Sequence, residues 1–259
     1  MDLIYEPTGK AAEYSPLALN VYTGGCEHRC SYCYCANGRA WSGTPRVRNL
    51  AGLEKEAAKA DKQILLSFMS DPYQPCEAIH RNTRRALEIL KAARCSVAIL
   101  TKGGTRCLDD LTMFQSWPNA RIKIGATLTF IDPQASLRHE PGAALPIDRL
   151  AALKTLHLSG VRTWASIEPV IDPAQSLQII EASLPFIDGY KVGKLNHRAS
   201  TTDWAAFGRT AIMMIRQAGK ALYVKHDLRA AMPGFEFRPE ETDPETMFLP
   251  ERPKETQHG

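Results

Sequence analysis

Short apolar runs alternate with amphipathic stretches along most of the chain. Apolar runs of four to nine residues are the pattern expected of strands buried in a sheet. Seven such runs are predicted to be strands: Leu17–Tyr22, Gln63–Phe68, Ser96–Thr101, Ile122–Phe130, Arg162–Ile167, Gly189–Val192 and Ala221–Lys225.

Helical periodicity separates these runs. Within residues 81–93, Ala86, Ile89 and Leu90 recur on one helical face. Asp172-Pro173 supplies an N-cap followed by a proline in the first turn. Helices are expected over residues 53–60, 81–93, 108–115, 147–159 and 172–183, and from Thr202 or Asp203 to about residue 218.

This alternation predicts a parallel α/β sheet with right-handed crossovers. A closed barrel needs eight strand–helix units, whereas six or seven are visible here. We therefore expect an open, partial (β/α)6 TIM-like barrel over residues 1–231. From about Met232 the chain becomes rich in proline and acidic residues, which predicts an extended acidic C-terminal tail over residues 232–259.

Composition agrees with a folded intracellular protein. The chain has 259 residues and is 44% hydrophobic, which is enough for a full core. No apolar run approaches the roughly 20 residues that span a bilayer, and the N-terminus lacks a basic-then-apolar signal pattern. We expect a cytoplasmic protein that does not bind a membrane.

Charge is distributed unevenly. The net charge is +4, but residues 232–259 hold seven acidic and three basic residues, a balance of −4, so residues 1–231 carry +8. A basic body suits a polyanionic partner. A solvated basic surface without a partner is the alternative.

Three cysteines form the clearest chemical motif. Cys26, Cys30 and Cys33 stand at C-x3-C-x2-C spacing directly after the first apolar run. Three thiolates can bind three irons of a 4Fe-4S cluster and leave the fourth iron open. Structural zinc, with His28 or Cys35 as a further ligand, is the alternative, although no second Cys/His pair appears downstream. A disulfide framework conflicts with the odd number of seven cysteines.

Polar residues follow the predicted strands, where parallel α/β barrels place their active sites. These strand-end candidates are Ser67, Ser70, Asp71, Thr127, Glu168, Lys194 and Asn196. An ordinary turn at Asp71-Pro72, a carboxylate paired with a base at Glu168 and a solvated loop at 194–196 are the alternatives.

Basic residues are also frequent near these strand ends. If the barrel is correct, they ring its open mouth, where they would contact a phosphate backbone or a small anionic metabolite. We call these nine residues the strand-end cations: Arg39, Arg46, Arg48, Lys102, Arg106, Lys194, Arg198, Lys225 and Arg229.

The cysteine spacing, with aromatic Tyr32 just before the last cysteine, resembles the signature of the radical SAM superfamily. The resemblance implies that the open iron of a 4Fe-4S cluster binds S-adenosylmethionine. It implies further that an electron from a reductase or a flavodoxin- or ferredoxin-type donor cleaves the C5′–S bond. The resulting 5′-deoxyadenosyl radical then takes a hydrogen atom from the substrate.

The same resemblance assigns roles to the strand-end candidates. The segment with Ser67, Ser70 and Asp71 is where such proteins receive the amino group of S-adenosylmethionine. Glu168 would accept hydrogen bonds from the ribose hydroxyls, Lys194 would meet the carboxylate, and Asn196 would meet the adenine or ribose. Tyr32 and Thr127 complete the implied cofactor site.

Several segments resemble the spore photoproduct lyase-like branch of this superfamily. They are Ile4-Tyr5-Glu6-Pro7, Tyr22-Thr23-Gly24-Gly25-Cys26, Asp71-Pro72-Tyr73-Gln74-Pro75, Leu100-Thr101-Lys102, Glu140-Pro141 and Arg149-Leu150. The namesake repairs a cross-linked thymine dimer in DNA with a cysteine as hydrogen donor and tyrosines nearby. A donor cysteine could be Cys76, just after the second predicted strand, or Cys107, after the third, and Tyr73 is a catalytic candidate by its proximity. For Cys76 the alternative is a small buried residue.

Three functions are consistent with the sequence. The first is a radical SAM enzyme that acts on a thymine-type base in DNA, by repair as a lyase or by hypermodification as an isomerase. The second is a radical SAM enzyme that acts on a small metabolite, a peptide or RNA. The third is a non-enzymatic zinc- or cluster-bearing nucleic-acid-binding protein.

Overall fold

The structure is a computed structural model, and it describes residues 2–37, 41–196 and 200–252. Its main sheet has eight strands in the order β1-β2-β5-β6-β7-β8-β9-β10. β1 is antiparallel to β2, and all the later pairs are parallel. The strands are β1 (Ile4–Tyr5), β2 (Leu17–Leu19), β5 (Ile64–Leu66), β6 (Val97–Thr101), β7 (Ile122–Thr127), β8 (Arg162–Ile167), β9 (Gly189–Val192) and β10 (Ala221–Val224).

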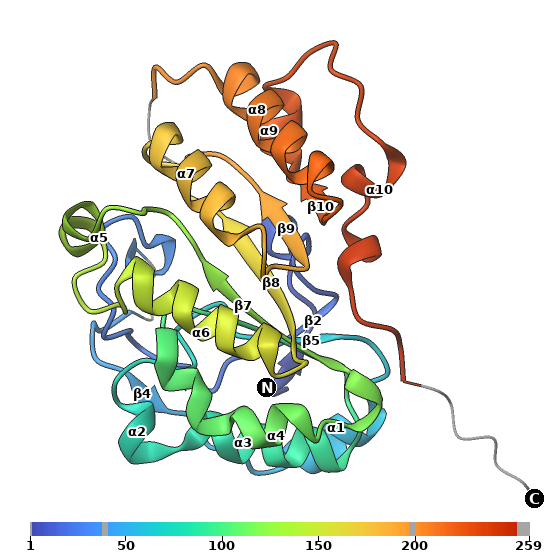
Figure 1. Cartoon of the computed structure of the whole chain (residues 1–259). Helices are drawn as coiled ribbons and strands as arrows, with labels where there is room; N and C mark the ends of the chain where they lie inside the picture. Colours follow the sequence, from blue (N-terminus) through green and yellow to red (C-terminus); the bar gives the residue numbers. More distant parts are fainter. Residues whose placement is uncertain (1, 38–40, 197–199, 253–259) are drawn as a thin grey trace, which may run out of the picture.

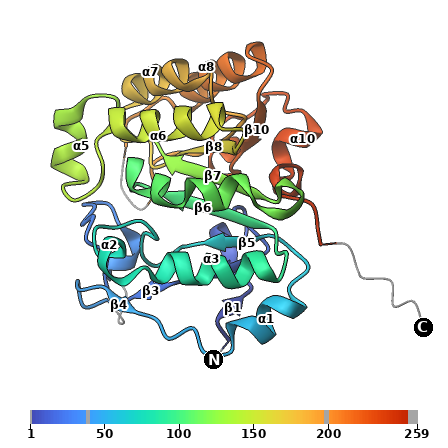
Figure 2. The ribbon, with the colours of Figure 1, turned by 60° about the horizontal axis from the view of Figure 1, so that its bottom comes forward.

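The parallel strands are neighbours in the same order as they occur along the chain. Each crossover therefore steps in the same direction, and right-handed crossovers place the helices on one face of the sheet. Figures 1 and 2 show these helices along the outside of the sheet. They are α1 (Leu53–Lys59), α3 (Asn82–Ala92), α4 (Leu111–Gln115), α6 (Pro146–Leu158), α7 (Pro173–Ser183) and α8 (Trp204–Gln217). The predicted mixed α/β fold with a mostly parallel sheet is confirmed.

Helix starts follow the expected capping chemistry. The Asp172 side chain accepts hydrogen bonds from the N–H groups of Ala174 and Gln175, at 2.9 and 3.2 Å. Of the two expected caps for α8, Asp203 is the one used, because its carboxylate accepts from the N–H of Ala206 at 2.9 Å.

Short elements were not predicted, because four to seven residues give little periodic signal. The additional α-helices are α2 (Glu77–His80), α5 (Pro133–His139), α9 (His226–Ala230) and α10 (Pro239–Thr242). The 3-10 helices are η1 (Gly9–Ala11), η2 (Tyr34–Asn37), η3 (Gly104–Asp110), η4 (Pro118–Ala120) and η5 (Pro244–Met247). The segment after residue 232 is therefore not uniformly extended.

The first predicted strand, residues 17–22, is divided in two. β2 ends at Leu19, and the Asn20 side chain accepts hydrogen bonds from the N–H groups of Phe68 and Met69, both at 2.9 Å. This side chain replaces a backbone rung between the strands. The chain then forms β3 (Tyr22–Thr23), which pairs antiparallel with β4 (Arg46–Val47) inside a region expected to be loop.

Each face of the sheet is covered differently. The helix-bearing face packs into the main apolar core, whereas Leu65, Ala98 and Trp164 form a small cluster on the opposite face, here called the inner face. Tyr14 packs against Trp164 with ring centroids 6.2 Å apart, so the N-terminal segment covers part of the inner face.

The C-terminal segment crosses the amino ends of β5 and β6. The N–H of Leu249 donates to Oε1 of Gln63 at 2.9 Å, and the Ser96 hydroxyl donates to the carbonyl of Pro250 at 2.5 Å. Earlier in the same segment, the acidic residue Glu241 of α10 is buried and accepts two 2.6 Å hydrogen bonds from Arg216 of α8.

Two lysines are buried on the inner face. Nζ of Lys123 donates to the carbonyl of Met247, and Nζ of Lys191 donates to the carbonyl of Glu13. Three aromatic rings, those of Tyr14, Tyr223 and Phe248, lie between 4.9 and 5.4 Å from Nζ of Lys191. Burial, and then the charge of Arg162, lowers the pKa of Lys123 to about 7.

Within residues 2–37, 41–196 and 200–252, none of the helices is long and apolar enough to cross a membrane.

We predict that Lys123→Met flattens the dependence of stability on pH. An unfolded lysine binds a proton up to about pH 10.4, whereas folded Lys123 loses it near pH 7. The wild-type free energy of unfolding should therefore rise between pH 7 and 10, by up to about 1.4 kcal/mol per pH unit from this residue. Urea unfolding at several pH values measures the slope.

Lys154→Met, at an exposed position of α6, is the matched control and should leave the slope unchanged. Equal slopes in wild type and Lys123→Met would show that Lys123 is charged in both folded and unfolded protein at pH 7 to 10.

Candidate metal centre

The three motif cysteines lie on the loop between β3 and η2, and all three are free thiols at half-buried positions. Backbone packs directly against this loop. A Cβ on Gly25 would lie 2.4 Å from the backbone carbon of Gly43, and a Cβ on Gly142 would lie 2.0 Å from the carbonyl oxygen of Glu27. Side chains at these two glycines would push the loop away from its supports.

The segment after β5 anchors the loop through hydrogen bonds. The Ser70 hydroxyl donates to the carbonyl of Gly25 at 2.5 Å, and the Gln74 amide donates to Ser70 at 2.8 Å. In return, the N–H of Glu27 donates to Gln74 at 2.9 Å, and the N–H of Cys76 donates to the Glu27 carboxylate at 2.6 Å. Ser70 therefore supports the cysteine loop from inside the protein.

His28 is a structural residue of this loop. It is 2% exposed, with Arg106 3.0 Å from Nε2 and the carboxylate of Asp71 3.4 Å from Nδ1. Both ring nitrogens are thus occupied by protein groups. Among the described residues, no group of three His, Cys, Asp or Glu side chains is placed to hold a single metal ion. With both ring nitrogens in contact with protein groups, His28 is not available as the further ligand of a zinc ion.

Asp71 is saturated by hydrogen bonds. It accepts from the Thr101 hydroxyl at 2.6 Å, from the N–H of Lys102 at 2.7 Å and from the N–H of Tyr73 at 2.9 Å. Burial alone would raise the pKa of this carboxyl, but His28 and these donors hold the pKa well below its usual value. The Ser67 hydroxyl donates to the carbonyl of Ser70 at 2.6 Å. Both side chains shape the turn after β5.

The cysteine environment suits a multi-iron cluster. In such a cluster each thiolate binds a different iron, so the three sulfurs need not converge on one point. Burial, followed by the charge of Asp71, raises the pKa of Cys26 to about 12, and burial raises that of Cys30 to about 11. A hydrogen bond from Cys35 lowers the pKa of Cys33 to about 6. Cluster binding would therefore release protons from Cys26 and Cys30.

A buried network connects the motif to β7. The Tyr32 hydroxyl donates to Glu140, and Glu140 pairs with Arg149 at 2.5 Å, with both charged side chains at most 1% exposed. Arg149 also donates to the carbonyl of Thr127 at 3.0 Å. Nζ of Lys102 lies 5.6 Å from the centre of the Tyr32 ring. A chain of hydrogen bonds therefore runs from Tyr32 through Glu140 and Arg149 to the backbone carbonyl of Thr127.

A second polar group gathers at the carboxyl ends of β8, β9 and β10. One oxygen of Glu168 accepts from Tyr14 at 3.1 Å and from Lys225, and the other accepts from the Asn196 amide at 2.7 Å. The Tyr14 hydroxyl also lies 2.8 Å from that of Ser166. Burial alone would lower the pKa of Lys225, but Tyr14 and Glu168 raise the pKa above its usual value. Glu168 is thus paired with a base and still partly exposed, at 13% of its side chain.

Most of the strand-end cations contact other groups of the protein. Arg48 donates to the carbonyls of Asp2 and Asn20, Arg229 donates to the carbonyl of Thr242, and Arg106 and Lys225 bind His28 and Glu168. Lys194 stacks at 6.0 Å from the Trp204 ring, and Arg46 is exposed. Arg39 and Arg198 lie outside the described residues. Arg48, Arg106, Lys225 and Arg229 of the expected ring therefore have partners within the protein.

The catalytic candidates Tyr73 and Cys76 are in the core. Tyr73 is 2% exposed, and its hydroxyl donates to Asp110 at 2.8 Å. Cys76 is 8% exposed at the start of α2. Burial, and then Glu27, raises the pKa of Cys76 to about 12, so it is a protonated thiol at neutral pH.

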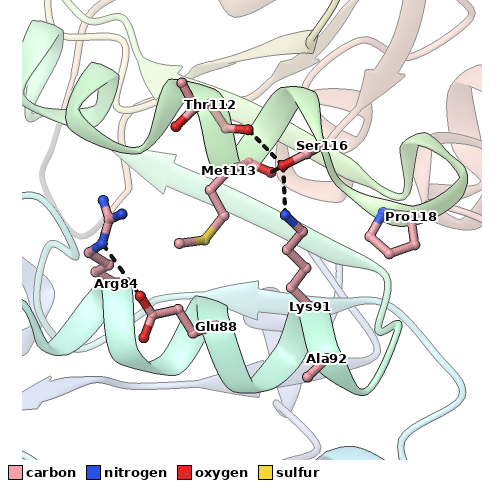
Figure 3. A pocket seen from close by; sticks show the side chains of 8 residues that line it. All are labelled: Arg84, Glu88, Lys91, Ala92, Thr112, Met113, Ser116 and Pro118. Carbon is pink, nitrogen blue, oxygen red and sulfur yellow. Dashed lines mark hydrogen bonds and ion pairs between the residues drawn. The ribbon is translucent and has the colours of Figure 1, made fainter.

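A surface groove lies away from these residues. It encloses about 560 Å³ between α3 and α4, with Lys91 bound to Ser116 at 2.6 Å across it (Figure 3). Both helices belong to the outer layer. None of the strand-end candidates lines this groove, so we do not assign it to the cysteine chemistry.

No protein-family model matches the chain. A curated relative is the uncharacterized protein MJ0683 of Methanocaldococcus jannaschii, which is 31% identical over 190 residues, or 70% of this chain and 71% of MJ0683. The chain belongs to the MJ0683 family.

Solved structures identify the fold of this MJ0683-family chain. Streptococcus suis SuiB bound to S-adenosylmethionine matches 85% of the chain with a TM-score of 0.63 and 14% identity, and the chain spans 53% of SuiB. A spore photoproduct lyase variant with dinucleoside spore photoproduct matches 86% of the chain with a TM-score of 0.66 and 14% identity, and the chain spans 79% of it. Both are radical SAM enzymes. The predicted spore photoproduct lyase-like radical SAM fold is confirmed.

Tyr14 and Glu13 were not among the predicted site residues. Both precede the first predicted strand, and their partners Glu168 and Tyr223 are more than 150 residues away. The pairing of Lys225 with Glu168 had a weak signal, because a strand-end base and a strand-end acid were both visible in the sequence.

We predict that Glu140→Gln destabilises the protein by about 3–5 kcal/mol, because it leaves the buried Arg149 charge without a counterion. Urea unfolding measures the change. Glu88→Gln is the control, since Glu88 and Arg84 are 3.5 Å apart on the surface of α3 and such pairs contribute less than about 1 kcal/mol. If both variants lost the same stability, the Glu140–Arg149 pair would not be a major support of the motif.

Proposed function

We propose that the chain is a radical SAM enzyme that holds a 4Fe-4S cluster through Cys26, Cys30 and Cys33. The observation that carries this proposal is the placement of three free, half-buried thiols on one braced loop of a radical SAM fold. When bound, the cluster would supply the electron that cleaves S-adenosylmethionine to a 5′-deoxyadenosyl radical. A flavodoxin- or ferredoxin-type protein, or another reductase, would supply that electron in the cytoplasm.

The proposed cofactor site lies along the carboxyl ends of the parallel strands. Their sequential order supports an open partial (β/α)6 barrel over residues 1–231, and residues 232–259 would form a C-terminal tail whose described part packs against that barrel. Ser67, Ser70 and Asp71 would shape the loop that receives the amino group of S-adenosylmethionine. Glu168 and Asn196 would meet the ribose, and Lys194 the carboxylate. Tyr32 and Thr127 would line the site.

The proposed substrate is a thymine-type base in a nucleotide or in DNA. The fold shared with a spore photoproduct lyase that holds a dinucleoside lesion supports this class. Burial of Tyr73 and Cys76 favours an isomerase over a lyase that needs one of them as hydrogen donor. An isomerase can return the hydrogen from 5′-deoxyadenosine and needs no donor side chain.

A smaller substrate or a peptide is the second candidate. Within residues 41–196 and 200–252, the internal contacts of Arg48, Arg106, Lys225 and Arg229 reduce the number of strand-end cations open to phosphates, which favours a substrate without a long phosphate backbone. The similar fold of SuiB, solved with its precursor peptide, agrees with this alternative.

We predict that Cys30→Ala abolishes both cluster assembly and cleavage of S-adenosylmethionine. Anaerobically reconstituted wild type should hold about four irons per chain and form 5′-deoxyadenosine after reduction. Cys95→Ala is the control, because Cys95 is buried in the core beside the carbonyl of Ala57. Full cleavage by Cys30→Ala would refute the ligand assignment, and zinc in place of iron would refute the enzyme.

We also predict that binding to duplex DNA depends only modestly on salt. Among the described strand-end cations, the exposed Arg46 is the one assigned to a phosphate, and one such contact would lower affinity about threefold between 50 and 200 mM salt, whereas six or more would lower it at least about a thousandfold. Fluorescence anisotropy with a labelled duplex measures the slope. A thousandfold loss would favour DNA gripped along its backbone and count against the smaller substrate.

A further inference from the structure

The N-terminal segment at residues 9–15 is anchored by hydrogen bonds on both sides of Tyr14, at Glu13 and at Ser15. The Glu13 carboxylate accepts from the Tyr223 hydroxyl and from the N–H of His226, both at 2.8 Å. Ser15 donates to the carbonyl of Gln63 at 2.9 Å. Between these anchors, the Tyr14 ring is held against Trp164 and, edge-on, against Phe68 at 6.1 Å. The position of the Tyr14 hydroxyl is therefore determined by packing on all sides.

That hydroxyl is directed at Glu168. It lies 3.1 Å from one carboxylate oxygen, which also accepts from Lys225, while Nζ of Lys225 sits 4.5 Å from the centre of the Tyr14 ring. Burial raises the pKa of Tyr14 to about 12, so the phenol is protonated and donates at neutral pH. Two donors thus hold one oxygen and fix the plane of the carboxylate.

The other oxygen of Glu168 has acceptor capacity to spare. It accepts one hydrogen bond, from the Asn196 amide at 2.7 Å, and a carboxylate oxygen has two acceptor positions. Oδ1 of the same Asn196 is a second acceptor beside it and contacts Lys10 at 3.4 Å. Two neighbouring acceptors match the two hydroxyl donors of a vicinal diol.

We propose that Tyr14 is a positioning residue that orients Glu168, beside Asn196, to bind the 2′- and 3′-hydroxyls of a ribonucleoside. This inference rests on the proposed function, in which the ribose of S-adenosylmethionine occupies this place. The N-terminal segment is then part of the nucleoside site and sets its preference for ribose over a sugar without hydroxyls.

The test compares two ligands, adenosine and 2′,3′-dideoxyadenosine, by calorimetry on the reconstituted protein. Wild type should bind adenosine at least about tenfold more tightly, as expected for hydrogen bonds to a charged group. Tyr14→Phe keeps the ring but removes the hydroxyl, and it should shrink this ratio about threefold or more. The ratio cancels any general loss of affinity, so a merely structural role would not change it.

Tyr223→Phe is the matched control, because it removes a hydroxyl that holds the same segment through Glu13 and does not touch Glu168. Its ratio should equal that of wild type. Should Tyr14→Phe fail to fold, Lys225→Met removes the other donor to the same oxygen and should shrink the ratio in the same way.

An unchanged ratio in folded Tyr14→Phe would overturn the positioning role, and absence of a ribose preference in wild type would overturn the Glu168 site. Formation of 5′-deoxyadenosine by wild type is measured separately. Its presence with either negative result would refute this inference alone, and its absence would refute the proposed function.

Discussion

Close contact between the cysteine loop and the backbone of distant segments is the constraint on which the site depends. Gly25 lies against Gly43, and Gly142 lies against Glu27, at distances that exclude a Cβ at either glycine. The Ser70 hydroxyl adds a hydrogen bond to the carbonyl of Gly25. These contacts keep three thiols on one loop at half-buried positions. They also explain why Ser70, Asp71 and His28 are occupied internally.

Buried charge in this protein is balanced locally. Glu140 faces Arg149, and Glu168 faces Lys225. A buried charge without a partner is strongly destabilising, so each pair constrains both residues. Each such pair is neutral as a whole, so the excess of positive charge over residues 1–231 is carried by other side chains.

Some features of the fold follow from local sequence. The strand–helix alternation, the Asp172 and Asp203 caps and the boundaries of β8 and β9 agree with the sequence pattern because they depend on residues within one or two turns of each other. Prediction failed at residues 17–22, where the Asn20 side chain takes the place of a backbone rung. It also failed for the short helices α2, α5, α9 and α10, which give little periodic signal, although α1 and α4 of similar length were predicted.

By itself, the sequence determined the sheet class and the likeness to radical SAM proteins, since the spacing of Cys26, Cys30 and Cys33 is a local property of the chain. Tertiary structure alone decided what the polar side chains face. Tyr14 and Glu168 are 154 positions apart and come together because the N-terminal segment crosses the inner face at β8. Whether a carboxylate is free to bind a ligand depends on such partners. Strand order and register, rather than neighbouring residues in the sequence, bring these partners within hydrogen-bonding distance of the carboxylate.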